Sequence, residues 1–528
     1  MKKISGLLLV GCSALALAGC GADDISSPGA GSITVNNPAP TPAPTPTPTS
    51  GTVTAAADCP AIGATTQLSN DGTISGPEGT WRVCTLPALI DADTTLPKID
   101  GLLYRLHGRV DVGCDGGFNA PATGAAYTTT TASCNGRSLT SDTNVTLKIN
   151  PGVIVYGENG SEAAWLAVNR GNKIDAQGTA AQPIIFTSAQ NVRGENDDTA
   201  QGQWGGVVLM GRGTVTDCTV GSIANSNCER DTEGSVNPAR FGGNDNTYDA
   251  GTMRYFQIRY SGYVLGSDVE LQSLTAEGVG SGTTLEYFQS VNSSDDGAEF
   301  FGGNVGFKHY ISVGADDDSL DLDTGLQGKF QYLLLLQRDG DGDALMEIDS
   351  NGAESDTPRQ KTIIANFTGV QPSANNNSDD AAVLIRGNSD ITWVNGILNV
   401  PNNECLRLNG SGTTPATLTA YSTVMTCNAA KYLGTGSYSV TDTQTQFGSG
   451  ANGNDDSFTS TLTDAFVNGT NESGVSPFDA STLDSFFDTT DYIGAVKNAA
   501  DTWYQGWTCD SSIAEFGSGE ACTALPTT

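Results

Sequence analysis

The sequence predicts an all-β protein that folds as a right-handed parallel β-helix. Short runs of β-branched and aromatic residues recur along the 528-residue chain, bounded by Gly, Asn or Asp, with little helical periodicity before the C-terminal region. The closest runs repeat about every 23 residues, as from Phe307 to Phe330. A repeat of this size indicates stacked coils, and strands in place of helices favour a β-helix. A β-sandwich array and a propeller are the alternatives, but propeller blades need about 40 to 50 residues and hairpin turns.

The first residues have the pattern of an export signal. Lys2 and Lys3 precede an apolar stretch that ends in the letters LAGC, where the cysteine is Cys20. Small residues before a cysteine are typical of a bacterial lipoprotein signal, so we expect residues 1–19 to be removed and Cys20 to carry lipid. An ordinary cleaved secretion signal is the alternative. Gly21 in place of Asp favours transfer to the outer membrane, so the predicted location is a lipid-anchored one that faces the cell exterior.

Four regions are expected after the signal. The tract NNPAPTPAPTPTPTSG cannot bury a core and favours extended polyproline geometry, which is typical of a spacer. The last coil of a β-helix exposes strand edges, so a C-terminal cap is expected as well. The predicted boundaries are residues 20–52 for the lipidated linker, 53–140 for a disulfide-containing N-terminal region, 141–430 for the β-helix and 431–528 for the C-terminal cap region.

The cysteines indicate an oxidising compartment. Of the twelve cysteines, Cys12 lies in the signal and Cys20 is the expected lipidation site, so ten remain. An even number in an exported protein predicts disulfides, although the sequence alone leaves the connectivity open. A zinc site is disfavoured because no CxxC motif occurs. Pairing of neighbours along the chain is the expected connectivity: Cys59 with Cys84, Cys114 with Cys134, Cys218 with Cys228, Cys405 with Cys427, and Cys509 with Cys522.

The charge of the chain excludes one class of partner. The sequence has 25 Lys and Arg against 59 Asp and Glu, a formal net charge of −34. Nucleic acid is not an expected partner, because phosphate backbones are bound by basic residues. An acidic exterior can instead bind divalent cations. Motifs for an activated serine, a zinc protease or a P-loop do not occur in the sequence, and no organic cofactor is expected.

Two acidic segments follow each other one repeat apart. The first reads SSDDGAEFFGG over residues 293–303, and the second reads GADDDSLDLDTG over residues 314–325. When Asp296 is aligned with Asp318, DGAEFF lies over DSLDLD. The apolar residues of both segments then point to the core, because side chains alternate along a strand. The carboxylates between them face outward, so acidic side chains of successive coils are expected to stack on each other.

Glu299 and Asp321 are the stacked pair that this alignment predicts. Neighbouring coils are about 4.8 Å apart, and two bare carboxylates at that separation repel by roughly 3–4 kcal/mol at an effective dielectric near 20. A cation would offset this repulsion, and Ca²⁺ accepts about six to eight oxygen ligands in flexible geometry. The expected ligands of a structural Ca²⁺ are Asp296, Glu299, Asp317, Asp318, Asp321, Asp323, Asp339, Asp341, Asp343 and Glu347.

Turn formation and catalysis are the alternatives to a cation site in these acidic segments. Asp and Asn start turns through side-chain to backbone hydrogen bonds, and each coil needs several turns. Catalysis is possible on this scaffold, because β-helix enzymes cleave acidic polysaccharides with bound Ca²⁺ and an Arg base, or with paired carboxylates. No catalytic residue is assigned, and His309, which alternates with apolar neighbours, is expected to be an ordinary sheet residue. The candidate bases, named by position alone, are Arg254, Arg259, Arg338 and Arg386.

Several segments resemble a large family of β-helix lipoproteins from Gram-negative bacteria that has no settled activity. They read GVIVYGENG, GNKIDAQGTAAQPIIFTSA, WGGVVLMGRG, GTMRYFQIRYSGY, GVGSGTTLEYFQSVNSSDDGAEFFGGNV, DDDSLDLDTGLQGKFQYLLL and DYIGAVKNAADTWYQGWT. The resemblance covers about residues 140–510. It implies a pectate-lyase-like right-handed β-helix at the cell surface, often found beside TonB-dependent receptors.

The sequence therefore favours a binding protein over an enzyme. The first hypothesis is an outer-membrane lipoprotein that binds a ligand or partner without catalysis and is accessory to a TonB-dependent receptor. The expected partners are the outer membrane, through lipid, and a TonB-dependent receptor, an extracellular glycan or further copies of the chain. The alternatives are a polysaccharide lyase or glycoside hydrolase on the same scaffold, and an adhesion or self-assembling module.

Overall fold

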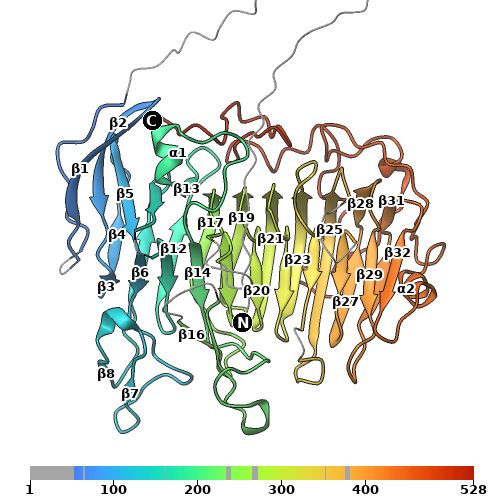
Figure 1. Cartoon of the computed structure of the whole chain (residues 1–528), viewed down its shortest axis with the longest axis horizontal. Helices are drawn as coiled ribbons and strands as arrows, with labels where there is room; N and C mark the ends of the chain where they lie inside the picture. The colour runs from blue at the N-terminus through green and yellow to red at the C-terminus, as the bar shows by residue number, and fades with distance from the viewer. Residues whose placement is uncertain are drawn as a thin grey trace, which may run out of the picture. The chain divides into compact units, whose positions relative to one another are not determined.

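The chain folds as the predicted parallel β-helix. Each coil adds its strands in parallel to those of the coil before it, which produces one sheet of 17 strands and one of 11 (Figure 1). Among the described residues, no helix is long and apolar enough to cross a membrane. Cys20, with the expected signal and linker, lies outside the described residues. The computed structural model describes residues 53–63, 66–160, 162–233, 239–263, 271–350, 353–374 and 381–527.

The 11-stranded sheet takes one short strand from each coil, and every neighbouring pair in it is parallel. The candidate site lies on the outer side of its middle strands. In stacking order the strands are β3 (Leu89–Ile90), β6 (Arg109–Val112), β11 (Trp165–Val168), β14 (Gly206–Met210), β18 (Leu274–Glu277), β20 (Glu299–Phe301), β22 (Asp321–Asp323), β24 (Met346–Ile348), β26 (Val383–Ile385), β29 (Leu406–Asn409) and β32 (Tyr432–Thr435).

The 17-stranded sheet is bent, because two rows of strands merge in it. From β17 to β25 a single long strand per coil belongs to both rows, whereas other coils use two shorter strands. The strands are β1 (Ser69–Gly76), β2 (Gly79–Thr85), β4 (Thr94–Leu96), β5 (Leu102–His107), β9 (Thr146–Ile149), β10 (Ile154–Glu158), β12 (Lys173–Gln177), β13 (Ile184–Ser188), β17 (Gly251–Arg259), β19 (Thr284–Val291), β21 (Asn304–Val313), β23 (Gln327–Leu336), β25 (Gln360–Val370), β27 (Ser389–Val394), β28 (Ile397–Val400), β30 (Thr417–Tyr421) and β31 (Val424–Cys427).

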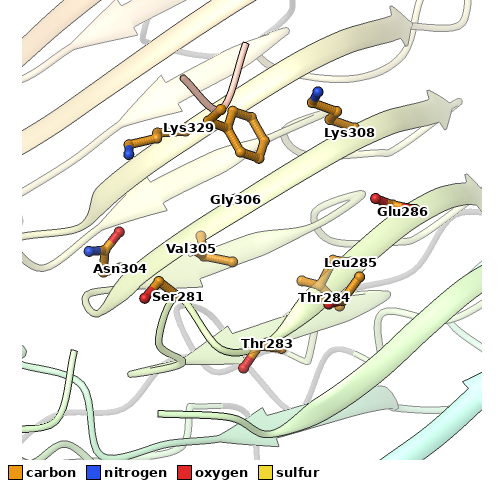
Figure 2. A pocket seen from close by; sticks show the side chains of 11 residues that line it. Ser281, Thr283, Thr284, Leu285, Glu286, Asn304, Val305, Gly306, Lys308 and Lys329 are labelled. Atoms are coloured by element: carbon orange, nitrogen blue, oxygen red, sulfur yellow. The ribbon is translucent and has the colours of Figure 1, made fainter. Parts of the chain in front are cut away.

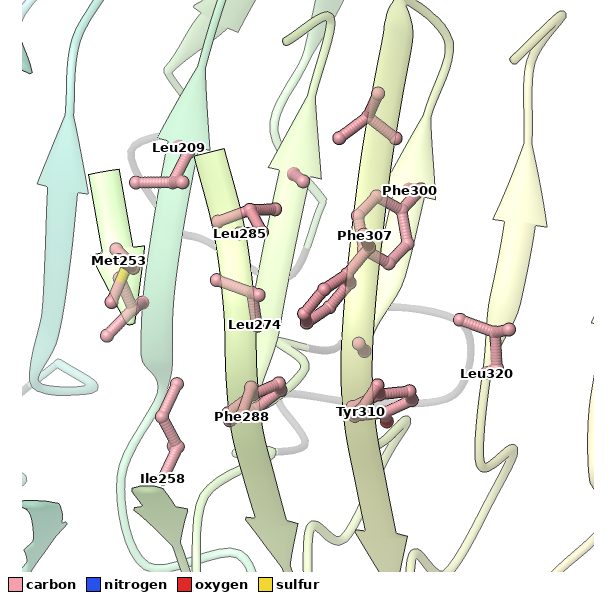
Figure 3. Packing of buried hydrophobic residues seen from close by; sticks show 14 of the residues in the cluster. Leu209, Met253, Ile258, Leu274, Leu285, Phe288, Phe300, Phe307, Tyr310 and Leu320 are labelled. Atoms are coloured by element: carbon pink, nitrogen blue, oxygen red, sulfur yellow. The ribbon is translucent and has the colours of Figure 1, made fainter. Parts of the chain in front are cut away.

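The core consists of inward side chains stacked coil on coil (Figure 3). Phe256 and Phe288 stack with their ring centroids 4.6 Å apart, and Phe288 and Tyr310 follow at 5.4 Å. Phe300 and Leu322 are fully buried in the same cluster, on neighbouring strands of the 11-stranded sheet. Each inward residue meets its counterpart in the next coil because the strands pair without a shift in register.

The bend of the long strands is formed by residues with a left-handed backbone. Tyr255, Tyr287, His309 and Tyr332 have φ between 50° and 64°, a region that non-glycine residues seldom occupy. Their rings stack in order at centroid distances of 4.2, 4.2 and 4.7 Å. His309 is therefore a packed sheet residue, as predicted. Burial, aided by the neighbouring Lys308, lowers its pKa to about 3.

The β-helix begins earlier than the predicted boundary at residue 141. Strand β2 pairs in parallel with β5, and β5 with β10, while β3 pairs with β6 in the other sheet. The described part of residues 53–140 thus belongs to the first coils and is not a separate region, apart from the antiparallel pair of β1 and β2. The excursion over residues 113–145 separates β6 from β9 and contains the small hairpin of β7 (Tyr127–Thr128) and β8 (Ser138–Leu139). This excursion interrupts the regular spacing of strands along the sequence, so the first coils could not be recognised from that spacing.

Only the start of the predicted C-terminal cap region covers the end of the β-helix. Helix α2 (Val440–Phe447) packs against β30 and β32, and Phe447 is buried in the core cluster. The remainder, which we call the strap (residues 458–527), runs back along the 17-stranded sheet towards α1 (Ala189–Arg193), as the red segment in Figure 1 shows. Trp503 and Trp507 belong to the strap, so they do not cap the last coil.

Amide side chains on the outer side of the long strands bind the strap. Asn395 donates a hydrogen bond to the carbonyl of Phe478 and accepts one from its N–H group. Gln289 makes the same pair of hydrogen bonds with the backbone of Cys509. Trp507 is fully buried and meets the rings of Tyr255 and Tyr287 edge-on. The strap therefore covers the outer side of the 17-stranded sheet, where it is held by side-chain hydrogen bonds instead of strand pairing.

All five predicted disulfides are confirmed. Each joins cysteines that are neighbours along the chain, with sequence separations of 10 to 25 residues. One of them closes the loop before the antiparallel pair of β15 (Arg230–Asp231) and β16 (Arg240–Phe241). The pairs are Cys59–Cys84, Cys114–Cys134, Cys218–Cys228, Cys405–Cys427 and Cys509–Cys522.

Candidate metal centre

The predicted row of stacked carboxylates is present on the 11-stranded sheet. Glu299 of β20 pairs in register with Asp321 of β22, which pairs with Glu347 of β24. These side chains point away from the core, because Phe300 and Leu322 between them point inward. The alignment of the two acidic segments therefore predicted the register correctly.

The loops before these strands contribute a second row. Asp296 accepts a hydrogen bond on Oδ1 from the N–H group of Asp318 at 3.0 Å. Asp318 accepts one on Oδ1 from the N–H group of Ala344 at 2.7 Å. Both aspartates thus tie one turn to the next, as expected of turn-forming residues. Only one oxygen of each carboxylate has this role, so turn capping does not account for the whole cluster.

Asp296, Glu299 and Asp321 bring carboxylate oxygens together at one point. One oxygen from each lies within 4.8 Å of the others. Asp296 is 5% exposed and Glu299 is 4% exposed, and Oε2 of Glu299 is buried with no hydrogen-bond partner among the described residues. Oδ1 of Asp321 is also buried and has no hydrogen-bond partner among the described residues. Buried anionic oxygens are normally paired with a charge or bound to a metal, so this arrangement needs a proton or a cation.

The electrostatics of the cluster oppose its full ionisation. Burial raises the pKa of Asp296 well above its ordinary value, and the neighbouring carboxylates raise it further. Burial and the charge of Asp321 do the same to the pKa of Glu299. For the pKa of Asp321, which is also raised, burial is again the main cause and Glu347 the next. Without a cation, these groups hold protons at pH values where isolated carboxylates have lost them.

Arginines pair with one end of the acidic row and with an acid beside it. Arg386 lies 2.6 Å from Glu347, at the end of the row. Arg230 lies 3.3 Å from Asp323, which stacks on Phe301 next to the row. In the described part of the chain, no Lys or Arg lies within ion-pair distance of Asp296, Glu299 or Asp321. The part of the row formed by Glu299 and Asp321 is therefore where a bound cation would be needed.

A disulfide-closed excursion covers the residues beside the row, Glu277, Phe301 and Asp323, from outside. The described residues 211–233 and 239–250 leave the β-helix between β14 and β17 and include the β15–β16 pair. Arg230 from this excursion lies over the ring of Phe301, with 5.3 Å between the guanidinium carbon and the ring centroid. Thr232 donates a hydrogen bond to Glu277 at 2.8 Å, and burial raises the pKa of Glu277 to about 8. Outward-facing acids are thereby buried, which the sequence pattern did not predict.

The family of the chain can be stated at this point. A family model described as a pectate-lyase like beta helix domain matches residues 128–508, most of the chain. The chain belongs to this family. Among curated proteins, none matches the sequence. The crystal structure of an alginate lyase from Paenibacillus sp. str. FPU-7 is similar at 12% identity and a TM-score of 0.23, covering 53% of this chain and 80% of that one.

Within this pectate-lyase-like β-helix, the predicted metal ligands divide into two sets. Asp296, Glu299, Asp317 and Asp321 belong to two overlapping groups of close carboxylates among the described residues, and Asp295, which the prediction left out, belongs to one of them. The others do not join either group, because they pair with arginine, cap a turn or lie in the loop before β24. These are Asp318, Asp323, Asp339, Asp341, Asp343 and Glu347.

The candidate catalytic bases are mostly remote from the acidic row. Arg254 pairs with Glu286 on the 17-stranded sheet. Arg259 is buried beneath the strap, where it donates hydrogen bonds to backbone carbonyls. Arg338 donates to the carbonyl of Asp198. Of the four candidates, only Arg386 lies beside the row.

Proposed function

We propose that this protein is an exported, non-enzymatic binding scaffold whose acidic coils are held together by Ca²⁺. The observation that carries the proposal is the position of Asp296, Glu299 and Asp321, of which one carboxylate oxygen each lies within 4.8 Å of the others. Within the described residues, Oε2 of Glu299 has no hydrogen-bond partner. The ion would replace the protons that the cluster otherwise retains. It would also join two successive coils, because Glu299 and Asp321 come from neighbouring strands.

The donor set favours Ca²⁺ over other divalent ions. All three ligands offer carboxylate oxygen, which suits Ca²⁺, Mg²⁺ and Mn²⁺, whereas zinc and copper sites use nitrogen and sulfur. The ligands come from one loop and two strands, so their geometry is irregular. Ca²⁺ accepts irregular sets of about six to eight oxygens, while Mg²⁺ requires a near-ideal octahedron.

The location and partner of the scaffold are part of the proposal. The lipoprotein pattern at Cys20 supports anchoring to the outer membrane, and five disulfides support an oxidising compartment. A TonB-dependent receptor and an extracellular glycan are the proposed partners. Protease treatment of intact cells tests the location: degradation of the protein supports exposure to the exterior, and full protection contradicts it.

Calorimetric titration of chelator-treated protein with CaCl₂ tests the metal centre. We expect binding by the wild type and its loss in Glu299→Gln, which removes a ligand charge but keeps the side chain's shape. Asp245→Asn is the matched control, because Asp245 is an exposed turn residue outside the row. Absence of binding in the wild type, or equal binding in Glu299→Gln, would contradict the proposal.

A polysaccharide lyase is the second candidate, and one contact favours it. Arg386 lies 2.6 Å from Glu347, one coil beyond Asp321, so a basic side chain stands beside the proposed cation. Release of unsaturated ends from a panel of acidic glycans would support this function. An Arg386→Gln variant that retained full activity would exclude Arg386 as the base.

A further inference from the structure

A groove of about 230 Å³ lies on the outer side of the 17-stranded sheet, whereas the acidic row lies on the 11-stranded sheet. Its floor is formed by β19, β21 and β23, and one wall comes from the strap (Figure 2). This volume is below the range of about 300–1,000 Å³ that is typical of sites for drug-sized molecules. The groove therefore suits a single ring-sized unit.

An aromatic ring from the strap forms the apolar part of the groove. Phe486 rests on Gly306, where a side chain is excluded: a Cβ atom added there would lie 2.5 Å from Cε2 of the ring. Lys308 lies over the ring, with its ammonium nitrogen 5.0 Å from the centroid. Phe486 remains half-buried, so part of the ring faces the groove.

The rest of the lining is mostly polar, and its charged groups are already paired. Lys308 pairs with Asp488 at 2.8 Å, and Lys329 pairs with Asp484 at 2.6 Å. Glu286 pairs with Arg254 at 2.8 Å. These pairs fix the positions of the charged groups, which have further N–H donors and oxygen acceptors for a ligand. Asn304 and Thr284 add an amide and a hydroxyl to the same lining.

The charge of the whole chain decides what kind of ligand the groove fits. A net charge of −34 repels polyanions over distances longer than a contact. The balanced ion pairs in the groove do not reverse this field locally. A neutral molecule rich in hydroxyl groups meets no such barrier, and its hydroxyls can both donate to carboxylates and accept from ammonium groups.

We infer that this groove binds one ring of a neutral extracellular glycan. The C–H face of a pyranose ring packs on Phe486, because these hydrogens carry partial positive charge and the aromatic face is negative. The ring hydroxyls bind Lys308, Lys329 and Glu286. The inference rests on the proposed binding role and gives its ligand a chemical class, but it does not depend on the metal centre.

The test uses Ca²⁺-loaded full-length protein and saturation-transfer NMR with a panel of hexasaccharides. The neutral arm contains β-glucans, α-glucans, mannan and xylan oligomers, and the anionic arm contains oligogalacturonate and oligoguluronate. We expect binding in the neutral arm that weakens about tenfold or more in Phe486→Ala. Phe478→Ala is the matched control, since Phe478 is a half-buried strap residue that stacks on Tyr421 away from the groove.

Asn304→Ala gives a second readout that leaves the strap unaltered, and its binding is expected to weaken as well. Thermal unfolding of each variant reports whether the β-helix is intact, and calorimetric Ca²⁺ titration reports on the metal centre separately. No binding in the neutral arm, binding in the anionic arm alone, or neutral binding that is equal in wild type and Phe486→Ala would overturn the inference. If Ca²⁺ binding persists in such a case, the groove assignment fails while the metal centre stands.

Discussion

Glu299 and Asp321 lie in register on adjacent parallel strands, and their carboxylates face the same side of the sheet. The two groups are held there by the core, because the apolar residues that alternate with them are buried in the stack. Neither can move away without disturbing its coil. The fold therefore fixes two acids next to each other, and the solution has to supply the compensating charge.

The stability of the metal-free protein is expected to fall as pH rises from about 5 to about 8. Glu277 and Asp323 have pKa values of about 8 in the folded state, mainly because they are buried. In the unfolded chain these groups titrate near pH 4, so between these values the folded state holds protons that the unfolded state has released. The stabilisation by these retained protons is fully present below the pKa of the unfolded chain. It is lost as the pH rises from that value through the pKa of the folded state, at about 1.4 kcal/mol per pH unit for each retained proton.

Urea denaturation in EDTA at pH 5, 6, 7 and 8 measures this dependence. The same series with CaCl₂ is its control, because the ion binds the deprotonated carboxylates and should restore stability most at pH 8. A stability that rises between pH 5 and 8 in EDTA would show that the acids are not protonated in the folded state.

Asp321→Asn is expected to stabilise the metal-free protein at pH 8 while weakening Ca²⁺ binding. The amide keeps the shape of the side chain but removes one of the repelling charges. The gain should be about 1–2 kcal/mol, less than the roughly 3.5 kcal/mol of a bare pair at an effective dielectric of 20. Thermal unfolding with EDTA gives the change in stability of the metal-free protein, and thermal unfolding with CaCl₂ gives the stabilisation that Ca²⁺ still provides. A variant that is less stable than the wild type in both conditions would contradict the prediction.

Arg230→Gln should destabilise the protein at high pH and much less at pH 5. Arg230 is the basic partner of Asp323 at 3.3 Å, and its removal leaves a buried carboxylate without that charge. The cost should be about 3 kcal/mol at pH 9, where Asp323 is ionised in the wild type. Denaturation curves at the two pH values check this. Equal losses at both would mean that Arg230 acts through its packing on Phe301 and its ion pair with Asp217, and not through Asp323.

Gln289→Leu is expected to loosen the strap. The substitution removes both hydrogen bonds to Cys509 and leaves two buried backbone groups without partners, at a cost of about 2–4 kcal/mol. Limited proteolysis should then cut within residues 458–527 sooner than in the wild type. Gln177→Leu, on an exposed strand position, is the control. Unchanged cleavage of the strap would show that other contacts hold it.

Local spacing in the sequence was enough to predict the coil register but not the parts that cover it. The alternation of Phe300 and Glu299, with a counterpart one repeat later, identified which acids stack. Glu277 and Asp323 beside them are covered by Arg230 and Thr232, which are far away in sequence and show no pattern that points to these acids. This burial was therefore not predictable from the strands alone.

The strap and the first coils were missed for related reasons. Gln289 and Asn395 look like ordinary outward polar residues of a strand, and only the fold shows that they bind the backbone of residues 458–527. Phe486 has no distinctive neighbours in the sequence, so no sequence pattern predicted the groove either. In the N-terminal part, the 113–145 excursion hides the repeat, whereas its disulfide partners, Cys114 and Cys134, were recognisable by spacing.

Anomalous diffraction from crystals of chelator-treated protein soaked in CaCl₂ tests the central claim most directly. We expect a calcium peak between the two coils, at about 2.3–2.6 Å from oxygens of Asp296, Glu299 and Asp321. The same position should lose its peak in crystals of Glu299→Gln. A well-ordered carboxylate cluster without a peak after soaking, or calcium bound only elsewhere on the molecule, would contradict a metal centre between these coils.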